Sequence, residues 1–243
     1  MIRTRAEQIQ DLKVSCVIPV FNGERFLAQA ITSVLMQTIP PHQIIVVDDG
    51  STDSTAQIIA SFGDRVEHIT QTNQGPAAAR NSGLGHATGE FIAFQDADDI
   101  WLPEKLERQL MNLLEDPNAI GCICLVLNFW EKELQEEAAA VRATRHGQPI
   151  AGYVFQAMLA RRNAFTLIGL LNPSLRVAED ADWFDRARAL GYRISLIEQT
   201  LVHRRYHGAN LSRSIATSAS AQEAMLEVVM RNLQRKRDAR ITD

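Results

Sequence analysis

An acidic cluster follows a short apolar run near the middle of the chain. Phe91–Phe94 is apolar on both faces, which is typical of a buried strand, and Asp96, Asp98 and Asp99 come within the next five residues. Adjacent carboxylates repel each other unless a cation lies between them, and their oxygens are the ligands that Mg²⁺ and Mn²⁺ prefer. The cluster therefore predicts a divalent-metal site at the carboxyl end of a strand, where open α/β sheets bind ligands. The structural alternative is that Asp98 or Asp99 caps a helix over Leu102–Leu114.

Composition restricts the class of protein. The 243 residues are 46% hydrophobic and 22% charged, as in ordinary globular proteins, and the formal net charge of −4 gives no broad basic surface for nucleic acid. The N-terminus has no apolar signal core, and the uncharged apolar run 119–130 is too short to span a bilayer as a helix. Three cysteines make no disulfide framework, and Cys122 and Cys124 are expected to be buried rather than zinc-bound. These features predict a reduced, cytoplasmic protein.

The elements that must position the acids alternate along the chain. Apolar runs that suit buried strands alternate four times with segments of helical periodicity, which predicts an α/β fold with a mainly parallel sheet and helices on both faces. The polar stretch 131–147 is either a helix or a mobile excursion. The predicted strands are Val14–Val20, Ile44–Val47, Val66–Thr70, Phe91–Phe94, Ile120–Phe129 and Arg193–Ile197.

Glycines suggest one nucleotide motif that the surrounding pattern excludes. Gly83, Gly85 and Gly89 resemble a dinucleotide fingerprint, but that fingerprint must follow a strand and open a helix. Here the glycines end a predicted helix and precede a strand. The G-x-x-x-x-G-K-[ST] pattern of P-loop enzymes does not occur. Neither class of nucleotide-binding site is therefore expected.

Five motifs occur together in one order. They are Pro19-Val20-Phe21-Asn22 at the end of the first strand, Val47-Asp48-Asp49-Gly50-Ser51-Thr52-Asp53 at the end of the second, Gly75 to Asn81 with Arg80, Asp96-Ala97-Asp98-Asp99, and Glu179-Asp180-x-x-Trp183. This set closely resembles the family 2 glycosyltransferases with the GT-A fold. The resemblance covers roughly residues 13–212, without 131–150. It implies a single domain with a Rossmann-like, mainly parallel but mixed central sheet flanked by helices.

The resemblance implies a site for a nucleotide-sugar. Asp49 matches the acid that accepts a hydrogen bond from the uracil ring N–H, and Arg80 matches a basic residue that reaches the nucleotide. Asp98 matches the direct ligand of a divalent metal, Mn²⁺ or Mg²⁺, whereas Asp96 matches the residue that meets the ribose. His207 matches a second metal ligand, and His203 is its nearby rival. The donor-site residues implied are Pro19, Val20, Phe21, Glu24, Asp49, Arg80, Asp96, Ala97 and Asp98.

The same resemblance implies the chemistry. Asp180 matches the general base that takes the proton of an acceptor hydroxyl as its oxygen attacks C1 of the sugar, in a single displacement that inverts the anomeric centre. Glu179 would lie beside it and orient the acceptor or raise the basicity of Asp180. Asp182 faces elsewhere on the helix and is expected to be structural. Trp101 and Trp183 are expected to pack in the core rather than bind the acceptor.

The chain is accordingly expected to use a UDP-sugar, with GDP- and dTDP-sugars as alternatives. The acceptor is expected to be a cell-surface glycan or a lipid-linked precursor, with a protein as an alternative. Many relatives have Phe-Asp-Glu where this chain has Leu171-Asn172-Pro173, so the motif says little about the acceptor. Two other functions remain open at this stage. One is a nucleotidyltransferase and the other is a non-catalytic partner subunit that binds a sugar nucleotide.

The predicted organisation has four parts. Residues 1–12 form a leader, 13–115 a nucleotide-sugar-binding half, 116–212 an acceptor-binding and catalytic half, and 213–243 a C-terminal helix. That helix contains Arg231, Arg235, Lys236 and Arg237. It either packs on the domain or lies on anionic lipid, which would place the protein at the inner face of the membrane.

Overall fold

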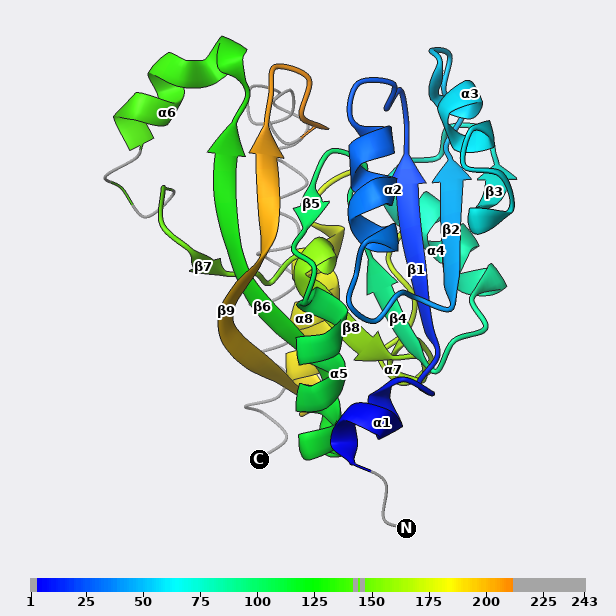
Figure 1. Cartoon of the computed structure of the whole chain (residues 1–243), viewed down its shortest axis with the longest axis vertical. Coiled ribbons are helices and arrows are strands. Elements are labelled where there is room, and N and C mark those ends of the chain that lie inside the picture. Colours follow the sequence, from blue (N-terminus) through cyan, green and yellow to red (C-terminus); the bar gives the residue numbers. More distant parts are fainter. Residues whose placement is uncertain (1–3, 142–143, 145–146, 212–243) are drawn as a thin grey trace.

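The centre of the computed structural model is one nine-stranded sheet, in the order β3-β2-β1-β4-β8-β6-β9-β5 with β7 beside β6 (Figure 1). The structure describes residues 4–141, 144 and 147–211. The predicted C-terminal helix over 213–243 lies outside these residues. The strands are β1 (Val14–Val20), β2 (Gln43–Asp48), β3 (Glu67–Thr70), β4 (Phe91–Phe94), β5 (Ile100–Trp101), β6 (Ala119–Trp130), β7 (Ile150–Ala151), β8 (Met158–Arg161) and β9 (Arg193–Tyr206).

The sheet is mixed, as predicted. Strands β3, β2, β1 and β4 are parallel, and so are β6 and β9, whereas β8 runs antiparallel between β4 and β6. Val20 pairs with Asp48 and Val17 pairs with Phe94, so β1, β2 and β4 end close together at one edge. The loops that follow these strands are therefore neighbours.

Helices cover both faces of the sheet. On one face lie α1 (Arg5–Ile9), α2 (Leu27–Leu35), α3 (Thr55–Ala60) and α5 (Lys105–Glu115), and on the other lie α4 (Pro76–His86), α7 (Ala164–Leu167) and α8 (Glu179–Ala189). Cys16 and Ile18 of β1 face the first layer, and Val17 faces the second. Because both faces are buried, the strands read as continuous apolar runs. The structure also contains α6 (Gln135–Val141) and the short 3₁₀ turns Gly63–Arg65, Lys132–Leu134 and Phe155–Ala157.

The structure corrects the predicted start of the helix after the acidic cluster and the predicted end of the last strand. The helix expected from Leu102 begins at Lys105, and Glu104 is its N-cap residue, so neither Asp98 nor Asp99 caps it. Between the acids and this helix, Ile100–Trp101 forms β5, which is too short to show a periodicity in the sequence. The late strand extends to Tyr206 because its second half pairs with β6.

Other expectations are confirmed. Cys122, Cys124, Trp101 and Trp183 are all buried. Part of the polar stretch after residue 130 is the helix α6. Within the described residues, no helix has the length and hydropathy that a membrane span needs.

Candidate active site

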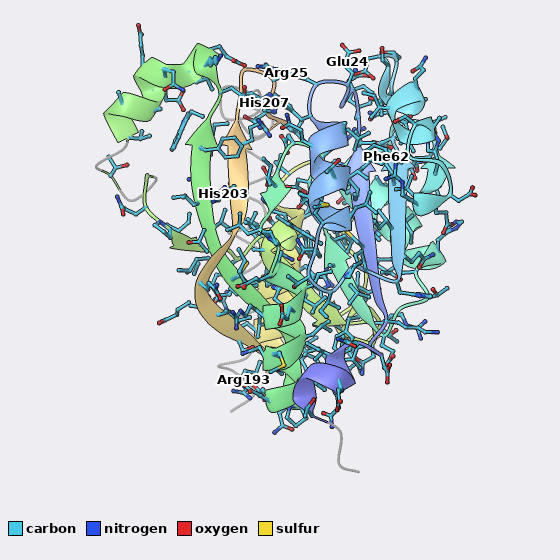
Figure 2. All side chains as sticks on the ribbon, in the orientation of Figure 1. Glu24, Arg25, Phe62, Arg193, His203 and His207 are labelled. Carbon is cyan, nitrogen blue, oxygen red and sulfur yellow. The ribbon has the colours of Figure 1, made fainter. Side chains whose placement is uncertain are left out.

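Polar loops gather at the edge where β1, β2 and β4 end. Figure 2 shows Glu24, Arg25 and His207 at this end of the molecule and Arg193 at the opposite end. The first loop follows β1, whose Pro19 and Val20 are buried, whereas Phe21 is 52% exposed. The structure therefore places the predicted donor residues along one edge, with Phe21 on its rim.

The loop after β1 is joined to the loop after β2 by hydrogen bonds from backbone N–H groups to side-chain oxygens. Asn22 has a positive φ of 52°, and its Oδ1 accepts from the N–H of Thr52 at 2.8 Å. The backbone N–H of Glu24 donates to Asp53, and the Glu24 carboxylate accepts from the N–H of Ser54 at 3.1 Å. Small polar residues that satisfy turn amides thus hold the two loops together.

Asp49 anchors a third loop. Its Oδ1 accepts from the Gln71 side chain at 2.8 Å and from the Gln74 N–H at 2.9 Å, and its Oδ2 accepts from the Gly75 N–H at 2.8 Å. Gly75 has a φ of 91° and is the N-cap residue of α4. Asp49, the predicted base-binding residue, is buried. Its carboxylate orders the loop that leads into α4 by accepting these hydrogen bonds.

Arg80 joins two of the predicted acids. Its Nη2 donates to Oδ1 of Asp96 and its Nη1 donates to Oε1 of Glu179, each at 2.6 Å. Arg80 is 6% exposed, and its guanidinium lies 5.5 Å from the centre of the Phe155 ring. The guanidinium thus links the loop after β4 to the first turn of α8, two segments that are far apart in the sequence.

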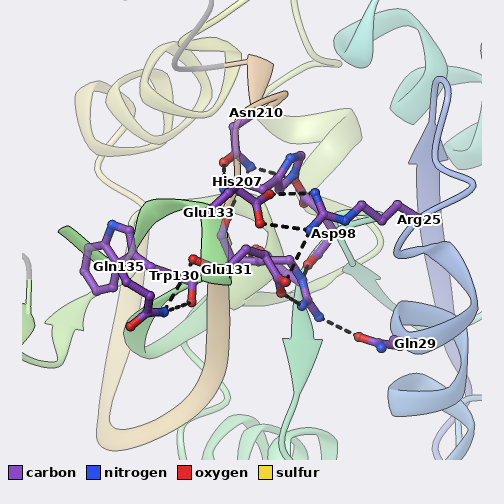
Figure 3. A network of polar contacts seen from close by, with 11 residues as sticks. Arg25, Gln29, Asp98, Trp130, Glu131, Glu133, Gln135, His207 and Asn210 are labelled. Atoms are coloured by element: carbon purple, nitrogen blue, oxygen red, sulfur yellow. Dashed lines mark hydrogen bonds and ion pairs between the residues drawn. The ribbon is translucent and has the colours of Figure 1, made fainter. Parts of the chain in front are cut away.

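Asp98 and His207 lie together, as predicted for a metal-ligand pair. The Nε2 atom of His207 lies 3.1 Å from Oδ2 of Asp98, and the Asn210 amide donates to the same oxygen at 2.9 Å (Figure 3). The backbone N–H of Ala209 lies 3.2 Å from Nδ1 of His207, so Nε2 is the ring nitrogen that faces Asp98. His203, the predicted rival, lies instead in β9 with its ring 6.2 Å from that of Phe129.

Asn210 and Arg205 belong to this site, although the sequence analysis did not select them. The Oδ1 atom of Asn210 accepts from the His207 N–H at 2.6 Å, and its amide also donates to the Arg205 carbonyl at 3.1 Å. The Arg205 guanidinium donates to the Asp98 carbonyl at 2.8 Å and to Glu131. The sequence held one signal for Asn210, because the Gly and Asn of His207-Gly208-Ala209-Asn210 favour a turn.

An aromatic ring lies behind the histidine. The Phe26 ring is 4.7 Å from the His207 ring, with the guanidinium of Arg205 at 4.4 Å and that of Arg25 at 4.6 Å. Arg25 also pairs with Glu133 at 2.6 Å, as Figure 3 shows. The residues after β6 are thus tied to the loop after β1 around the Asp98–His207 pair.

Burial changes the acidity of three acids at the site. Asp99 is 2% exposed, and burial raises the pKa of its carboxyl well above the usual value, with Asp98 and Asp96 adding to the rise. Burial also raises the pKa of Glu179, which Arg80 opposes. The pKa of Asp180 is raised by burial too, against the effects of the Ala181 N–H and Arg80. A carboxylate with a raised pKa is a stronger base.

Arg204 is a further cation close to the acids. Its charge lowers the pKa of Asp180, and its own pKa is raised by Tyr206, Asp99 and Asp96 although burial opposes this. Asp182 instead is buried and pairs with Arg186 at 2.9 Å, which confirms the structural role expected for it.

The donor set fits a divalent cation that is only partly held by protein. Asp98 and His207 provide one carboxylate oxygen and one imidazole nitrogen, and Asp98 keeps 30% of its side chain exposed. The described residues contain no group of three or more His, Cys, Asp or Glu side chains that would enclose a metal. Two protein ligands suit Mg²⁺ or Mn²⁺, because these ions are commonly completed by water and substrate phosphates.

A family model, "Glycosyl transferase family 2", matches residues 15–166. The chain therefore belongs to this family of glycosyltransferases, and the match includes 131–150, which the sequence analysis left outside the resemblance. An uncharacterized glycosyltransferase, alr2836 of Nostoc sp. (strain PCC 7120), is 31% identical over 229 residues, or 88% of this chain and 70% of that protein. The glycosyltransferase class predicted from the sequence is confirmed.

Other relatives are similar over a shorter part. A UDP-Glc:alpha-D-GlcNAc-diphosphoundecaprenol beta-1,3-glucosyltransferase of Escherichia coli, WfgD, is 40% identical over 110 residues, 44% of each chain. An uncharacterized glycosyltransferase of Rickettsia felis matches over 49% of this chain but only 20% of its own length. The crystal structure of S. aureus TarS 1-349 with UDP-GlcNAc has a TM-score of 0.68 at 20% identity, and covers 90% of this chain and 66% of that one. This likeness confirms the GT-A-like fold.

Proposed function

We propose that this glycosyltransferase moves a sugar from a UDP-sugar to a hydroxyl group of a lipid-linked or cell-surface glycan precursor, with inversion at the anomeric carbon. One observation carries the proposal. Arg80 bonds both to Asp96, beside the metal-ligand candidate Asp98, and to Glu179, beside the base candidate Asp180. The groups that would hold the donor and activate the acceptor thus adjoin one another.

The choice of Asp180 as base rests on the contacts of the two neighbouring acids. Glu179 is buried and bonded to Arg80, so its carboxylate is committed to the protein. Asp180 is partly exposed, and among the described residues its Oδ1 accepts only from the Ala181 N–H at 2.7 Å. Its raised pKa also favours proton uptake. Asp180 takes the proton of the acceptor hydroxyl, the acceptor oxygen bonds to C1, and the bond from C1 to the diphosphate oxygen breaks.

The donor side is proposed to use the loops after β1, β2 and β4. Pro19, Val20 and Phe21 line the base and ribose, and Glu24 and Asp49 contact the nucleoside. Asp96 and Ala97 adjoin the ribose, and Arg80 lies behind Asp96, where its guanidinium donates to that carboxylate. A divalent cation held by Asp98 and His207 would supply positive charge for the departing diphosphate.

The nucleotide and acceptor are supported by the relatives alone. The name of WfgD specifies a UDP-glucose donor and a diphosphoundecaprenol-linked acceptor, and TarS was crystallised with UDP-GlcNAc. Both point to a UDP-sugar, and the first points to a lipid-linked acceptor. Contact with the inner face of the membrane would bring the enzyme to such an acceptor.

A turnover assay tests this proposal. The protein is incubated with UDP-glucose, UDP-GlcNAc or UDP-galactose, Mn²⁺ and a short polyprenyl diphosphate-linked sugar, and UDP release is followed together with the product's NMR spectrum. We expect UDP release with one donor and a product of inverted anomeric configuration. Retention of configuration, or the absence of turnover with every donor, would contradict the proposal.

A further inference from the structure

We propose that Arg80 is a positioning residue that holds the start of α8, and with it Asp180, against the loop that carries Asp96 and Asp98. The inference rests on the proposed function, because it concerns the geometry of that reaction. It differs from the role that the family resemblance implies for Arg80, which is a direct contact with the nucleotide.

The hydrogen bonds of Arg80 favour this role. Both terminal nitrogens of the guanidinium are bonded to protein carboxylates at 2.6 Å, and the Nε atom has no hydrogen-bond partner among the described residues. Arg80 is also 6% exposed, so a nucleotide phosphate has little access to the guanidinium beside these two carboxylates. Because a planar guanidinium presents its N–H groups in a fixed fork, it sets the relative positions of the two acids as well as attracting them.

The start of α8 needs such a contact. Its N-cap residue, Ala178, has a φ of 60° and ψ of 19°, the left-handed conformation that an alanine rarely adopts, and no side chain caps the helix. The first turn then carries Glu179 and Asp180. A strained backbone persists only where its surroundings hold it. The Arg80–Glu179 bond is placed to do this, directly after the strained residue.

The charges agree with the geometry. Asp96, Glu179 and Asp180 surround Arg80, and each raises its pKa while burial opposes them. Without Arg80, the carboxylates of Asp96 and Glu179 would lose their shared cationic partner inside the protein. We therefore expect the first turn of α8 to move away from Asp96 when Arg80 is replaced, which would displace Asp180 from the sugar.

Steady-state kinetics of Arg80→Met and Arg80→Lys, together with UDP affinity by calorimetry, test the inference. Displacement of a reacting group by about 1 Å costs on the order of a hundredfold in rate. We expect Arg80→Met to lose kcat by about that factor, while the donor KM and the UDP dissociation constant change by less than about threefold. Arg80→Lys should recover only part of kcat, because an ammonium group cannot span both acids. If Arg80→Met does not fold, the reduced kcat of Arg80→Lys at unchanged UDP affinity tests the inference instead.

A double-variant cycle adds a readout that a nucleotide contact would not give. If Arg80 acts through Glu179, then Glu179→Gln should cost much less in the Arg80→Met protein than in the wild type. Arg108→Met is the matched control, because Arg108 is exposed on α5 and pairs with Glu104, away from the site. It should retain wild-type kcat.

Other results would overturn the inference. A tenfold or greater loss of UDP affinity with unchanged kcat would identify Arg80 as a nucleotide ligand, and additive effects of the two substitutions would exclude coupling through Glu179. In both cases the wild-type enzyme still turns over, so the proposed function stands. Absence of turnover in the wild type itself would remove the proposed function and this inference together.

Discussion

Oδ2 of Asp98 and Nε2 of His207 lie 3.1 Å apart, although the two residues are separated by 109 positions in the sequence. The contact joins the loop after β4 to the end of β9. Asn210 keeps it in place by bonding to the carboxylate of Asp98 and to the backbone of His207. Two candidate ligands of different chemistry thus lie side by side, as the metal proposal requires.

Replacing His207 should weaken metal binding. In the presence of UDP, we expect His207→Ala to lower Mn²⁺ affinity about tenfold or more, because one of two protein ligands is lost. The measurement is the electron paramagnetic resonance signal of free Mn²⁺ in a titration. His203→Ala is the control, since His203 contacts Phe129 away from Asp98. An unchanged affinity in His207→Ala would show that this histidine is no ligand.

Replacing Asp180 should stop transfer but leave the donor bound. Loss of a general base costs about 10²–10⁴-fold in rate, so Asp180→Asn should lose kcat by a factor in this range. UDP affinity should be unchanged, because the proposed role of Asp180 concerns the acceptor. The two quantities are measured by UDP release and by calorimetry. If Asp180→Asn retained kcat, Asp180 would not be the base.

The pH dependence of the rate should reflect the surroundings of Asp180. Because the base acts in its deprotonated form and its pKa is raised by burial, the rate should begin to fall at a higher pH than for an ordinary aspartate. Arg204 lowers this pKa, so Arg204→Gln should move the acidic limb of the kcat/KM profile to still higher pH. Arg193→Gln, at the opposite end of the sheet, should leave the profile in place. A shift to lower pH in Arg204→Gln would contradict the assignment.

Two glycines of α4 should respond in opposite ways to alanine. A Cβ at Gly83 would lie 2.4 Å from Cγ1 of Val17, so Gly83→Ala should destabilise the fold by about 1–3 kcal/mol. A Cβ at Gly85 would meet nothing within 4 Å, and Gly85→Ala should stabilise the helix by about 1 kcal/mol. Urea unfolding of both variants measures the difference. Equal effects would show that α4 does not approach β1 this closely.

A buried lysine should make stability depend on pH. Burial lowers the pKa of Lys105 to about 8, so below that pH the lysine is charged in both the folded and unfolded chain. At higher pH the unfolded chain holds more protons, and the stability contributed by this group rises until the ordinary lysine pKa is reached. The raised pKa values of Cys16, Cys122 and Cys124, each caused by burial, act in the opposite direction once thiols of the unfolded chain ionise.

The comparison of Lys105→Met with the wild type isolates the lysine, because the cysteines are common to both. We expect the difference in unfolding free energy, variant minus wild type, to fall by about 2 kcal/mol between about pH 7 and about pH 10. Urea unfolding at several pH values measures this difference. A difference that does not change with pH would show that Lys105 titrates as an exposed lysine does.

The sequence predicted those parts of the molecule that local patterns determine. Continuous apolar runs identified β1, β2 and β4, because strands buried on both faces have no polar alternation. The family motifs predicted that Asp98, His207 and Asp180 belong to one active site. The roles of Asn210 and Arg205 depend on contacts with Asp98 across more than 100 residues, and no local pattern contains such contacts. Similarly, the sequence indicated that Arg80 belongs to the site, but its bonds to Asp96 and Glu179 became visible only in the fold.

Thermal unfolding with UDP, GDP, dTDP, ADP or CDP, each with and without Mn²⁺, tests the donor site most directly. A ligand at about one hundred times its dissociation constant adds about 2.7 kcal/mol of stability, and each kcal/mol raises Tm by about 2–4 °C in a domain of this size. We predict that UDP raises Tm by several degrees when Mn²⁺ is present, and that Asp98→Ala abolishes this shift. If no nucleotide changes Tm in either condition, the donor site is not where Asp98 and His207 meet.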